Sequence, residues 1–202
     1  MLTITGISRQ AIAARPASAL ATSDEDLVRA ISAGDRNAMQ ALYARHNVRV
    51  YRFILRLTND TSLAEDLASE VFIDVWRRAA SFKEKSQVST WLLAIARYKA
   101  LSALRRRPDE QLDERAAVAI EDPADDAETL VDNRNRSDIV RKCLMQLSAV
   151  HREVIDLVYY HEKTVEEVAG IVGTPASTVK TRMFYARQRL GRLLEAAGLD
   201  GI

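Results

Sequence analysis

The chain has 202 residues, of which 48% are hydrophobic and only seven are glycine, and its formal net charge is +1. This composition is typical of a globular protein and excludes wholesale disorder. No apolar run is long enough to cross a bilayer, and the single cysteine, Cys143, excludes an internal disulfide. We therefore expect a cytoplasmic protein of one large or two small domains, without membrane insertion, in which Cys143 fills a small core position.

Residues 1–22 are rich in alanine, serine and threonine, include Arg9 and Arg15, and contain no acidic residue. This composition resembles that of an organellar transit peptide, but no continuous apolar segment supports a secretory signal. We expect a disordered N-terminal extension to which no function is assigned.

Charge is unevenly distributed along the chain. Residues 108–133 contain ten acidic residues and only one basic residue, Arg115, a net charge of −9, so the remainder of the chain carries +10. With Pro108, Pro123 and few large apolar side chains, this segment predicts a flexible acidic linker. Two basic domains joined by such a linker favour a polyanionic partner.

Residues 23–107 predict a domain of four helices without β-strands, because apolar side chains recur at helical spacing. Ser23, with Asp26 three residues later, forms a capping signal for the first helix. Ser62, with Glu65, forms a similar signal for the third. The expected ranges are 23–34, 35–58, a third helix after Ser62, and, beyond a loop at 81–89, a fourth helix over 90–107.

Residues 134–196 predict a second helical domain, followed by a tail at 197–202. Ser148 is expected to cap one helix, and Thr164 with Glu167 forms the capping box of the next. Gly173 then ends that helix, because glycine adopts the left-handed conformation without steric penalty. The complete chain is therefore expected to be all-α, with two small helical domains.

The last helix of the second domain is strongly basic. Thr174 is expected as its N-cap and Pro175 as its first residue, which completes a helix-turn-helix. Such a motif places its second helix in the DNA major groove. A solvated amphipathic hairpin is the alternative, disfavoured because this last helix contains several cations and no acidic residue before Glu195. The candidate base-contacting residues are Ser177, Thr178, Lys180 and Thr181, and the candidate phosphate-contacting residues are Arg187, Arg189 and Arg192.

Residues 77–107 combine nine cations with one acidic residue, Glu84, and with the aromatic residues Phe82, Trp91 and Tyr98. Cations that hold a backbone beside rings that stack on bases are typical of single-stranded nucleic-acid binding. For Trp91, a place in the core is the simpler interpretation.

An acidic stripe, Asp66, Glu70 and Asp74, is predicted on one face of the third helix. Such a stripe is usually only a solvated face, but a basic protein partner would relieve its mutual repulsion. Catalytic signals are absent from the sequence: His46, His151 and His161 have no metal-ligand spacing, and no nucleotide-binding glycine pattern occurs. We expect no metal, no cofactor and no enzymatic activity.

Two blocks of sequence together resemble regions 2 and 4 of bacterial sigma factors of the extracytoplasmic function (ECF) group. The resemblance covers about residues 24–107 and 134–196. The region 2 block comprises SLAEDLASEVFIDVWR (62–77), STWLLAIAR (89–97) and LSALRRR (101–107), and the region 4 block comprises VEEVAGIVG (165–173) and TVKTRMFYAR (178–187).

The resemblance implies a role for each surface and a set of partners. It implies docking on core RNA polymerase through Asp66, Glu70 and Asp74. It further implies melting of promoter DNA, capture of the non-template strand and regulation by an anti-sigma factor. Tyr185 stands where many relatives carry a cation, which puts a phosphate contact there in doubt. The implied −10 residues are Lys83, Ser86, Thr90, Trp91, Arg97, Lys99, Arg105 and Arg106, and the implied −35 residues are Ser177, Thr178, Lys180, Thr181, Arg182, Phe184, Tyr185 and Arg187.

Two other classes of protein remain open at this stage. A free-standing helix-turn-helix regulator would bind duplex DNA alone, usually as a symmetric dimer. It would need neither the acidic stripe nor the aromatic and basic segment of the first domain. A protein-interaction adaptor with an incidental basic helix would show no salt-sensitive DNA binding.

Overall fold

The computed structural model describes residues 22–106 and 130–199, with side chains from residue 136 in the second range. The expected N-terminal extension and most of the expected linker therefore lie outside the described residues. Within the described ranges the chain is helical and contains no β-strand. None of the described helices is sufficiently long and apolar to cross a membrane. The elements are α1 (Asp24–Ser32), α2 (Arg36–Thr58), α3 (Thr61–Arg78), the short 3₁₀ turn η2 (Ala79–Ser81), α4 (Val88–Arg106), α5 (Leu130–Met145), α6 (Ala149–Ile155), the π-helical turn η3 (Asp156–Tyr160), α7 (Val165–Val172) and α8 (Ala176–Ala196).

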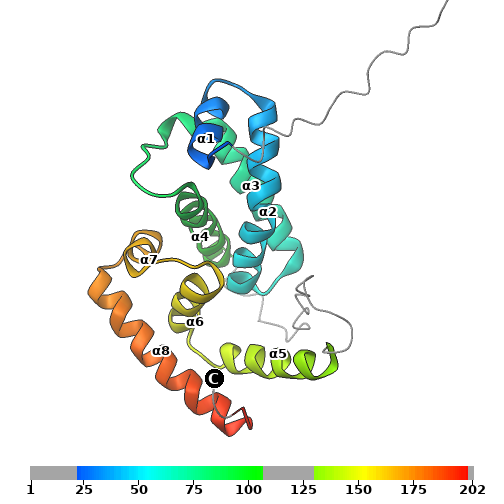
Figure 1. Cartoon of the computed structure of the whole chain (residues 1–202), viewed down its shortest axis with the longest axis vertical. Coiled ribbons are helices and arrows are strands. Elements are labelled where there is room, and N and C mark those ends of the chain that lie inside the picture. Colours follow the sequence, from blue (N-terminus) through cyan, green and yellow to red (C-terminus); the bar gives the residue numbers. More distant parts are fainter. Residues whose placement is uncertain (1–21, 107–129, 200–202) are drawn as a thin grey trace, which may run out of the picture.

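Helices α1 to α4 form an N-terminal domain around α2, which packs against each of the other three (Figure 1). Leu42, Phe53 and Ile54 of α2 are fully buried, as are Val71 and Val75 of α3. The recurrence of apolar residues every three or four positions directs one face of each helix into this core.

Most of the expected helix caps are confirmed, including those at Ser23 and Ser148. Thr164 and Glu167 make both hydrogen bonds of the capping box, and Gly173 ends α7 in the left-handed conformation with φ 70°. The cap expected at Ser62 is wrong, because the Asp60 carboxylate accepts a hydrogen bond from the Leu63 amide at 2.9 Å. Helix α3 therefore begins at Thr61.

The cap expected at Thr174 is also wrong. Pro175 is the last non-helical residue, with ψ 147°, and α8 begins at Ala176. The extended Pro175 separates the Thr174 side chain from the helix. The Thr174 hydroxyl is buried without a hydrogen-bond partner in the described part of the chain.

Helices α5 to α8 form a C-terminal domain, in which α8 packs against α5, α6 and α7. Cys143 is buried and its thiol donates to the Leu193 carbonyl oxygen at 3.5 Å, which confirms its expected core position. Helix α5 already covers residues 130–133, the end of the expected linker. The π-helical turn η3 was not expected from the sequence.

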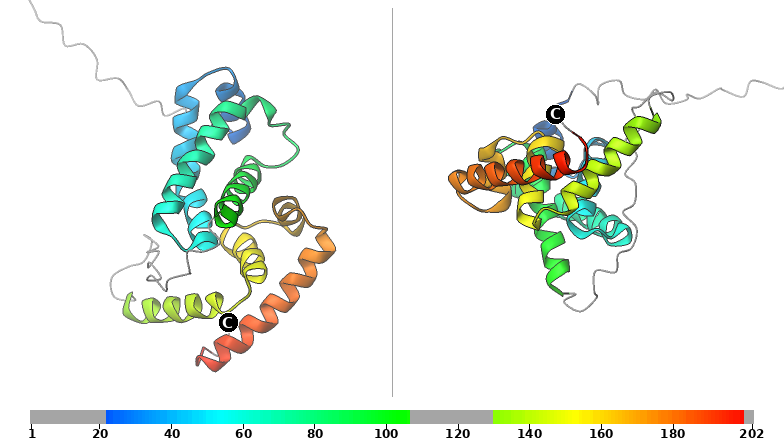
Figure 2. Two further views of the ribbon diagram at one scale, coloured as in Figure 1. Left: turned by 180° about the vertical axis from the view of Figure 1, so that it is seen from behind. Right: turned by 90° about the horizontal axis from the view of Figure 1, so that it is seen from below.

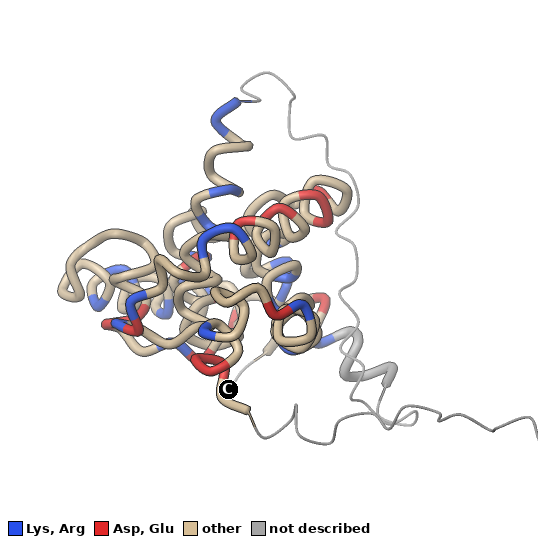
Figure 3. The backbone as a smooth tube through the Cα atoms, turned by 90° about the horizontal axis from the view of Figure 1, so that it is seen from above, with Lys and Arg blue, Asp and Glu red and all other residues tan. Residues whose placement is uncertain are grey.

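The two domains are in contact, with α7 packed against α4. In Figure 1, α4 lies between the remainder of the N-terminal domain and helices α6 and α7. The C-terminal end of α4 projects beyond the body of the molecule, as the second view in Figure 2 shows. This end carries Arg105 and Arg106, visible as the basic tip next to the grey trace in Figure 3.

Candidate nucleic-acid interface

The outer face of α8 displays most of the side chains expected to read DNA. Ser177, Lys180 and Thr181 are exposed, as are Phe184 and Tyr185, at 63% and 53%. The opposite face of the helix is fixed in the core by Val179, Met183 and Ala186. Thr178 and Arg182 lie at the boundary between these faces and are half-buried, and Arg187, Arg189 and Arg192 are exposed.

Local contacts order part of this face. The Thr181 hydroxyl donates to the Ser177 carbonyl oxygen at 3.1 Å, one turn earlier. The rings of Phe184 and Tyr185 meet edge to face, with centroids 5.4 Å apart. The Arg187 guanidinium lies 5.7 Å from the centre of the Tyr159 ring in η3. These contacts leave Lys180 exposed, so the helix presents cations and hydroxyls together to a ligand.

Two of the expected −10 residues on α4 are covered by the C-terminal domain. Thr90 is only 5% exposed, and its hydroxyl donates to Glu167 Oε1 at 2.5 Å. Arg97 makes a bidentate pair with Glu153, at 2.6 Å from Nε and 3.2 Å from Nη2. Charged hydrogen bonds of this kind are roughly twice as strong as neutral ones.

The other expected −10 residues are divided between exposed and packed positions. Lys83 and Ser86 are exposed in the loop before α4, and Arg105 and Arg106 are exposed at its projecting end. Trp91 is half-buried against Phe82, with ring centroids 5.0 Å apart, and contacts the hydrophobic core. This position agrees with the core interpretation of Trp91.

The acidic stripe on α3 is partly neutralised by the chain itself. Lys99 of α4 lies 3.0 Å from both Glu70 and Asp74, whereas Asp66 is exposed and forms no ion pair within the described part of the chain. Burial alone would lower the pKa of Lys99, but its hydrogen bonds to Asp74 and Glu70 outweigh this effect and raise it. Lys99, expected to contact DNA, is thus joined to the expected polymerase-docking stripe.

Two apolar side chains beside this stripe were not identified from the sequence. Ile73 is 48% exposed and Trp76 is 39% exposed, both on α3. The sequence could have indicated their exposure, because neither residue belongs to the four-residue spacing of Leu67, Val71 and Val75 that enters the core. Exposed apolar residues beside acidic ones are typical of protein-docking surfaces.

Lys163 and Glu167 form the second polar contact between the domains. Lys163 is nearly inaccessible, and its ammonium group donates to Ser89 Oγ at 2.7 Å, Gln87 Oε1 at 3.1 Å and Glu167 Oε1 at 3.2 Å. Burial would raise the pKa of Glu167. The hydrogen bonds from Thr90, the Thr164 amide and Lys163 outweigh this effect and lower it to about 2.

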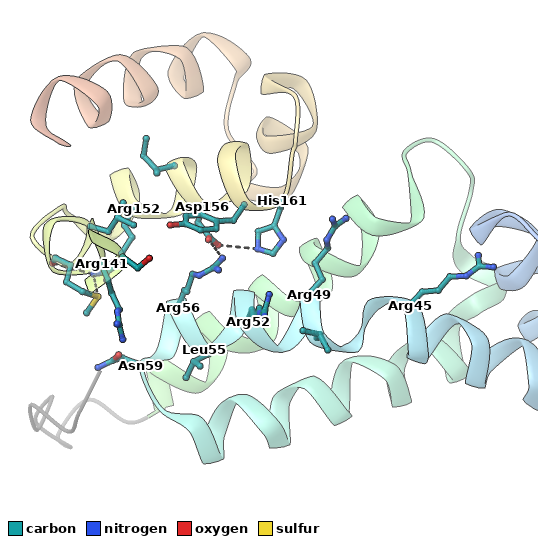
Figure 4. Close-up of a pocket in the computed structure, with 16 residues that line it drawn as sticks. Arg45, Arg49, Arg52, Leu55, Arg56, Asn59, Arg141, Arg152, Asp156 and His161 are labelled. Carbon is teal, nitrogen blue, oxygen red and sulfur yellow. Dashed lines mark hydrogen bonds and ion pairs between the residues drawn. The ribbon is translucent and has the colours of Figure 1, made fainter. Parts of the chain in front are cut away.

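A third contact lies within a hollow of about 520 Å³ between α2, α5 and α6 (Figure 4). Arg56 pairs with Asp156 and stacks on the Tyr160 ring, 4.1 Å from its centre. His161 is buried edge to face against Phe53, with centroids 5.3 Å apart. The hollow is lined by a group of arginines, namely Arg45, Arg49, Arg52, Arg56, Arg141 and Arg152.

Titratable side chains do not gather into a metal-binding group anywhere in residues 22–106 and 136–199. The groups exposed on the outer face of α8 are cations, hydroxyls and aromatic rings, which suit an anionic or stacked ligand.

Family models match both domains. Residues 42–108 match Sigma-70 region 2, and residues 143–191 match Sigma-70 region 4. The chain is 32% identical over 183 residues to the ECF RNA polymerase sigma factor SigK of Mycobacterium tuberculosis H37Rv, covering 87% of this chain and 96% of that protein. A SigK from Mycobacterium sp. strain KMS is 33% identical over 171 residues, which cover 80% and 86% of the two chains.

Two solved structures have a similar fold. One is the sigma factor RpoE in complex with the anti-sigma factor NepR from Bartonella quintana, with a TM-score of 0.61 and 29% identity over 76% of this chain and 94% of that chain. The other is CnrH in complex with the cytosolic domain of CnrY, with a TM-score of 0.65 and 22% identity over 87% and 99% of the two chains. The second likeness shows the fold alone.

Proposed function

The chain belongs to the extracytoplasmic function group of RNA polymerase sigma factors, and from this premise we propose how its surfaces divide the work of promoter recognition. The outer face of α8 reads the −35 element as duplex DNA. The observation that carries this assignment is the arrangement of α8, with Lys180, Thr181 and Phe184 exposed on one face while Val179 and Met183 fix the other in the core. A rigid helix that presents cations and short polar groups suits the major groove.

We assign the −10 element to α4 and the loop before it. Lys83 and Ser86 are accessible to an unpaired base, and Arg105 and Arg106 project where they can hold phosphates. Thr90 and Arg97 complete this surface once the C-terminal domain has moved away from them. The strand that these groups suit is the melted non-template strand, because cations beside aromatic rings bind unpaired bases without a duplex.

Docking on core RNA polymerase is assigned to the exposed face of α3. Asp66 supplies an accessible negative charge, and Ile73 and Trp76 supply apolar area. Glu70 and Asp74 contribute if Lys99 exchanges its partners. We further propose that the factor acts in the cytoplasm under the control of an anti-sigma factor, since the similar solved structure of RpoE contains the bound anti-sigma factor NepR.

The experiment that tests this function is transcription in vitro from a library of genomic fragments, with the purified chain, core RNA polymerase and sequencing of transcript starts. We expect discrete starts that share upstream motifs and that disappear when the chain is omitted. Tight binding of duplex DNA by the chain alone, without any such starts, would instead identify a free-standing regulator.

A further inference from the structure

The interdomain contacts conflict with the proposed function. The positions in their names place the −35 and −10 elements about 25 base pairs apart, which is about 85 Å of straight B-DNA at about 3.4 Å per base pair. Helix α8 has 21 residues and is about 32 Å long at about 1.5 Å per residue. Since α7 packs against both α4 and α8, the two reading surfaces cannot reach both elements in this arrangement.

The chain has the length needed to separate its domains. The 23 residues between Arg106 and Leu130 can span up to roughly 80 Å when extended, at about 3.3–3.6 Å per residue. The domains can therefore move apart without unfolding α4 or α5. What must break is the set of contacts that α4 makes with α6 and α7, together with those that Arg56 and Phe53 of α2 make with η3 and His161.

These contacts have the same chemistry as the ligand that they exclude. The C-terminal domain offers the carboxylates of Glu153 and Glu167 to Arg97 and Thr90, which are the groups assigned to the −10 strand. A carboxylate accepts hydrogen bonds from a guanidinium with the same bidentate geometry as a phosphate. Arg97 retains only 23% of its side-chain exposure, so a nucleic-acid strand cannot share it with Glu153.

We propose that the C-terminal domain is an internal competitor of the −10 strand, which holds the chain in a closed resting state through Glu153 and Glu167. This inference rests on the proposed function for the identity of the competing ligand. We call the contacts of Glu153 with Arg97, and of Glu167 and Lys163 with residues 87–90, the interdomain latch. The latch opens when polymerase and promoter DNA bind the separated domains more tightly than the domains bind each other.

The polar character of the latch makes such an opening feasible. Glu153 and Lys163 are buried only as long as the domains stay together, and each has a charged or polar partner in the other domain. On separation these groups return to water and recover their hydration, so the opening leaves none of them buried without a partner. Removing a single charge from the closed state leaves its partner buried and uncompensated, which shifts the equilibrium toward the open state.

The test compares two double variants of the full chain that change the charge equally. Glu153→Gln with Glu167→Gln removes the two latch carboxylates, and a glutamine at position 167 retains the capping box. Glu162→Gln with Glu166→Gln is the matched control, since both residues are exposed acids of the same domain. Each is made in a Cys143→Ala background, with spin labels on cysteines at the exposed positions Ala80 of η2 and Gly170 of α7.

We expect the labelled parent and the control to give one short interdomain distance, and the latch variant to lower the closed-to-open ratio by about tenfold or more. Core RNA polymerase should then bind the latch variant several-fold more tightly, because less of the chain is in the closed state. A parent that already shows long, broad distances would overturn the latch. Equal distances in the latch variant and the control would also overturn it.

A second variant tests whether the latch can be strengthened, without any change in the hydrophobic core. Gln87 is exposed and its side chain lies 3.1 Å from Lys163 Nζ, so Gln87→Glu places a carboxylate beside this ammonium group. The closed fraction should rise; a fall would contradict the latch. Because distances are measured without DNA, they separate a failed latch from a failed sigma function. If the latch variant opens but starts no transcript, the sigma function is refuted and the latch is not.

Discussion

The two helices to which we assign DNA recognition carry similar side chains, but these differ in accessibility. On α8, Lys180 and Thr181 are exposed and available to a ligand, whereas on α4, Arg97 and Thr90 are already bound by carboxylates of the other domain. The comparison shows that residue type and helical position indicate what a surface can bind, but not whether it is accessible. In this structure the −35 surface is open and the −10 surface is partly closed.

The largest effect that the comparison predicts is at the open surface. Lys180→Ala with Thr181→Ala should lower −35-dependent transcription by about 100-fold or more, since base contacts contribute about 1–3 kcal/mol each. Binding to core RNA polymerase should not change, because neither side chain contacts α3. Transcription in vitro and a separate polymerase-binding titration measure the two quantities.

The control for this variant is Glu195→Ala, an exposed position on the same helix outside the predicted reading surface. It should retain full transcription. If the double variant lost polymerase binding along with transcription, α8 would serve in docking, and the division of labour between α8 and α3 would be wrong.

The next effect distinguishes covered from open positions on α4 itself. Arg97→Ala and Arg105→Ala should each lower −10-dependent transcription by about tenfold, the loss expected for one charged contact. Only Arg97→Ala should also lengthen the interdomain distance. Arg105 donates to the Leu101 carbonyl oxygen and the Ser102 hydroxyl of its own helix, and to none of the described residues of the C-terminal domain.

Paired measurements of transcription and distance decide this prediction. If Arg105→Ala opened the chain as much as Arg97→Ala, opening would follow from lost charge on α4 rather than from the bond to Glu153. The distinction between the covered and the open part of α4 would then not hold.

Local features of this fold were predictable from the sequence because they depend on neighbouring residues. The capping box of Thr164 and Glu167 and the left-handed Gly173 are examples, each set within a few positions. The error at Ser62 is local as well. Asp60 and Ser62 are both acceptable caps, and aspartate competed successfully for the Leu63 amide.

The interdomain latch was not predictable, because its partners are far apart in the chain. Arg97 and Glu153 are separated by 56 positions, and Thr90 and Glu167 by 77. From the sequence, Glu153 is an ordinary helical acid, and Glu167 is already explained by its capping role. Pairing across the acidic linker depends on how two domains dock, and no periodicity encodes that arrangement. The resemblance predicted DNA-binding positions, but it gave no indication that Thr90 and Arg97 are bound by the other domain.

A smaller effect is expected at the polymerase-docking stripe, where the same contrast of free and occupied groups recurs. Asp66→Arg with Glu70→Arg should weaken binding to core polymerase about fivefold to tenfold, through repulsion by a basic partner surface. Of the single variants, Asp66→Arg should have the larger effect, because Glu70 already shares its charge with Lys99.

Glu162→Arg with Glu166→Arg serves as the control for the stripe. It introduces the same charge change at two exposed positions of the C-terminal domain, outside the docking face of α3. Unchanged polymerase affinity in the double variant, or an equal loss in the control, would show that the stripe is only a solvated face.

The smallest effect predicted is the pH dependence that Glu167 gives to the closed state. Its pKa in the folded chain is about 2, below its ordinary value of 4.5. A carboxyl group whose folded-state pKa is lowered contributes stability above its unfolded value and loses it as pH falls toward the folded value. The free energy of unfolding of the parent should therefore exceed that of Glu167→Gln by a constant amount above about pH 5, and the difference should shrink between pH 4.5 and pH 2.

Chemical denaturation of both proteins across this range measures the difference. A gap that persists unchanged at pH 2 would mean that the Glu167 charge is not what holds Lys163 and Thr90, and the contrast between the covered α4 and the open α8 would then rest on Glu153 alone.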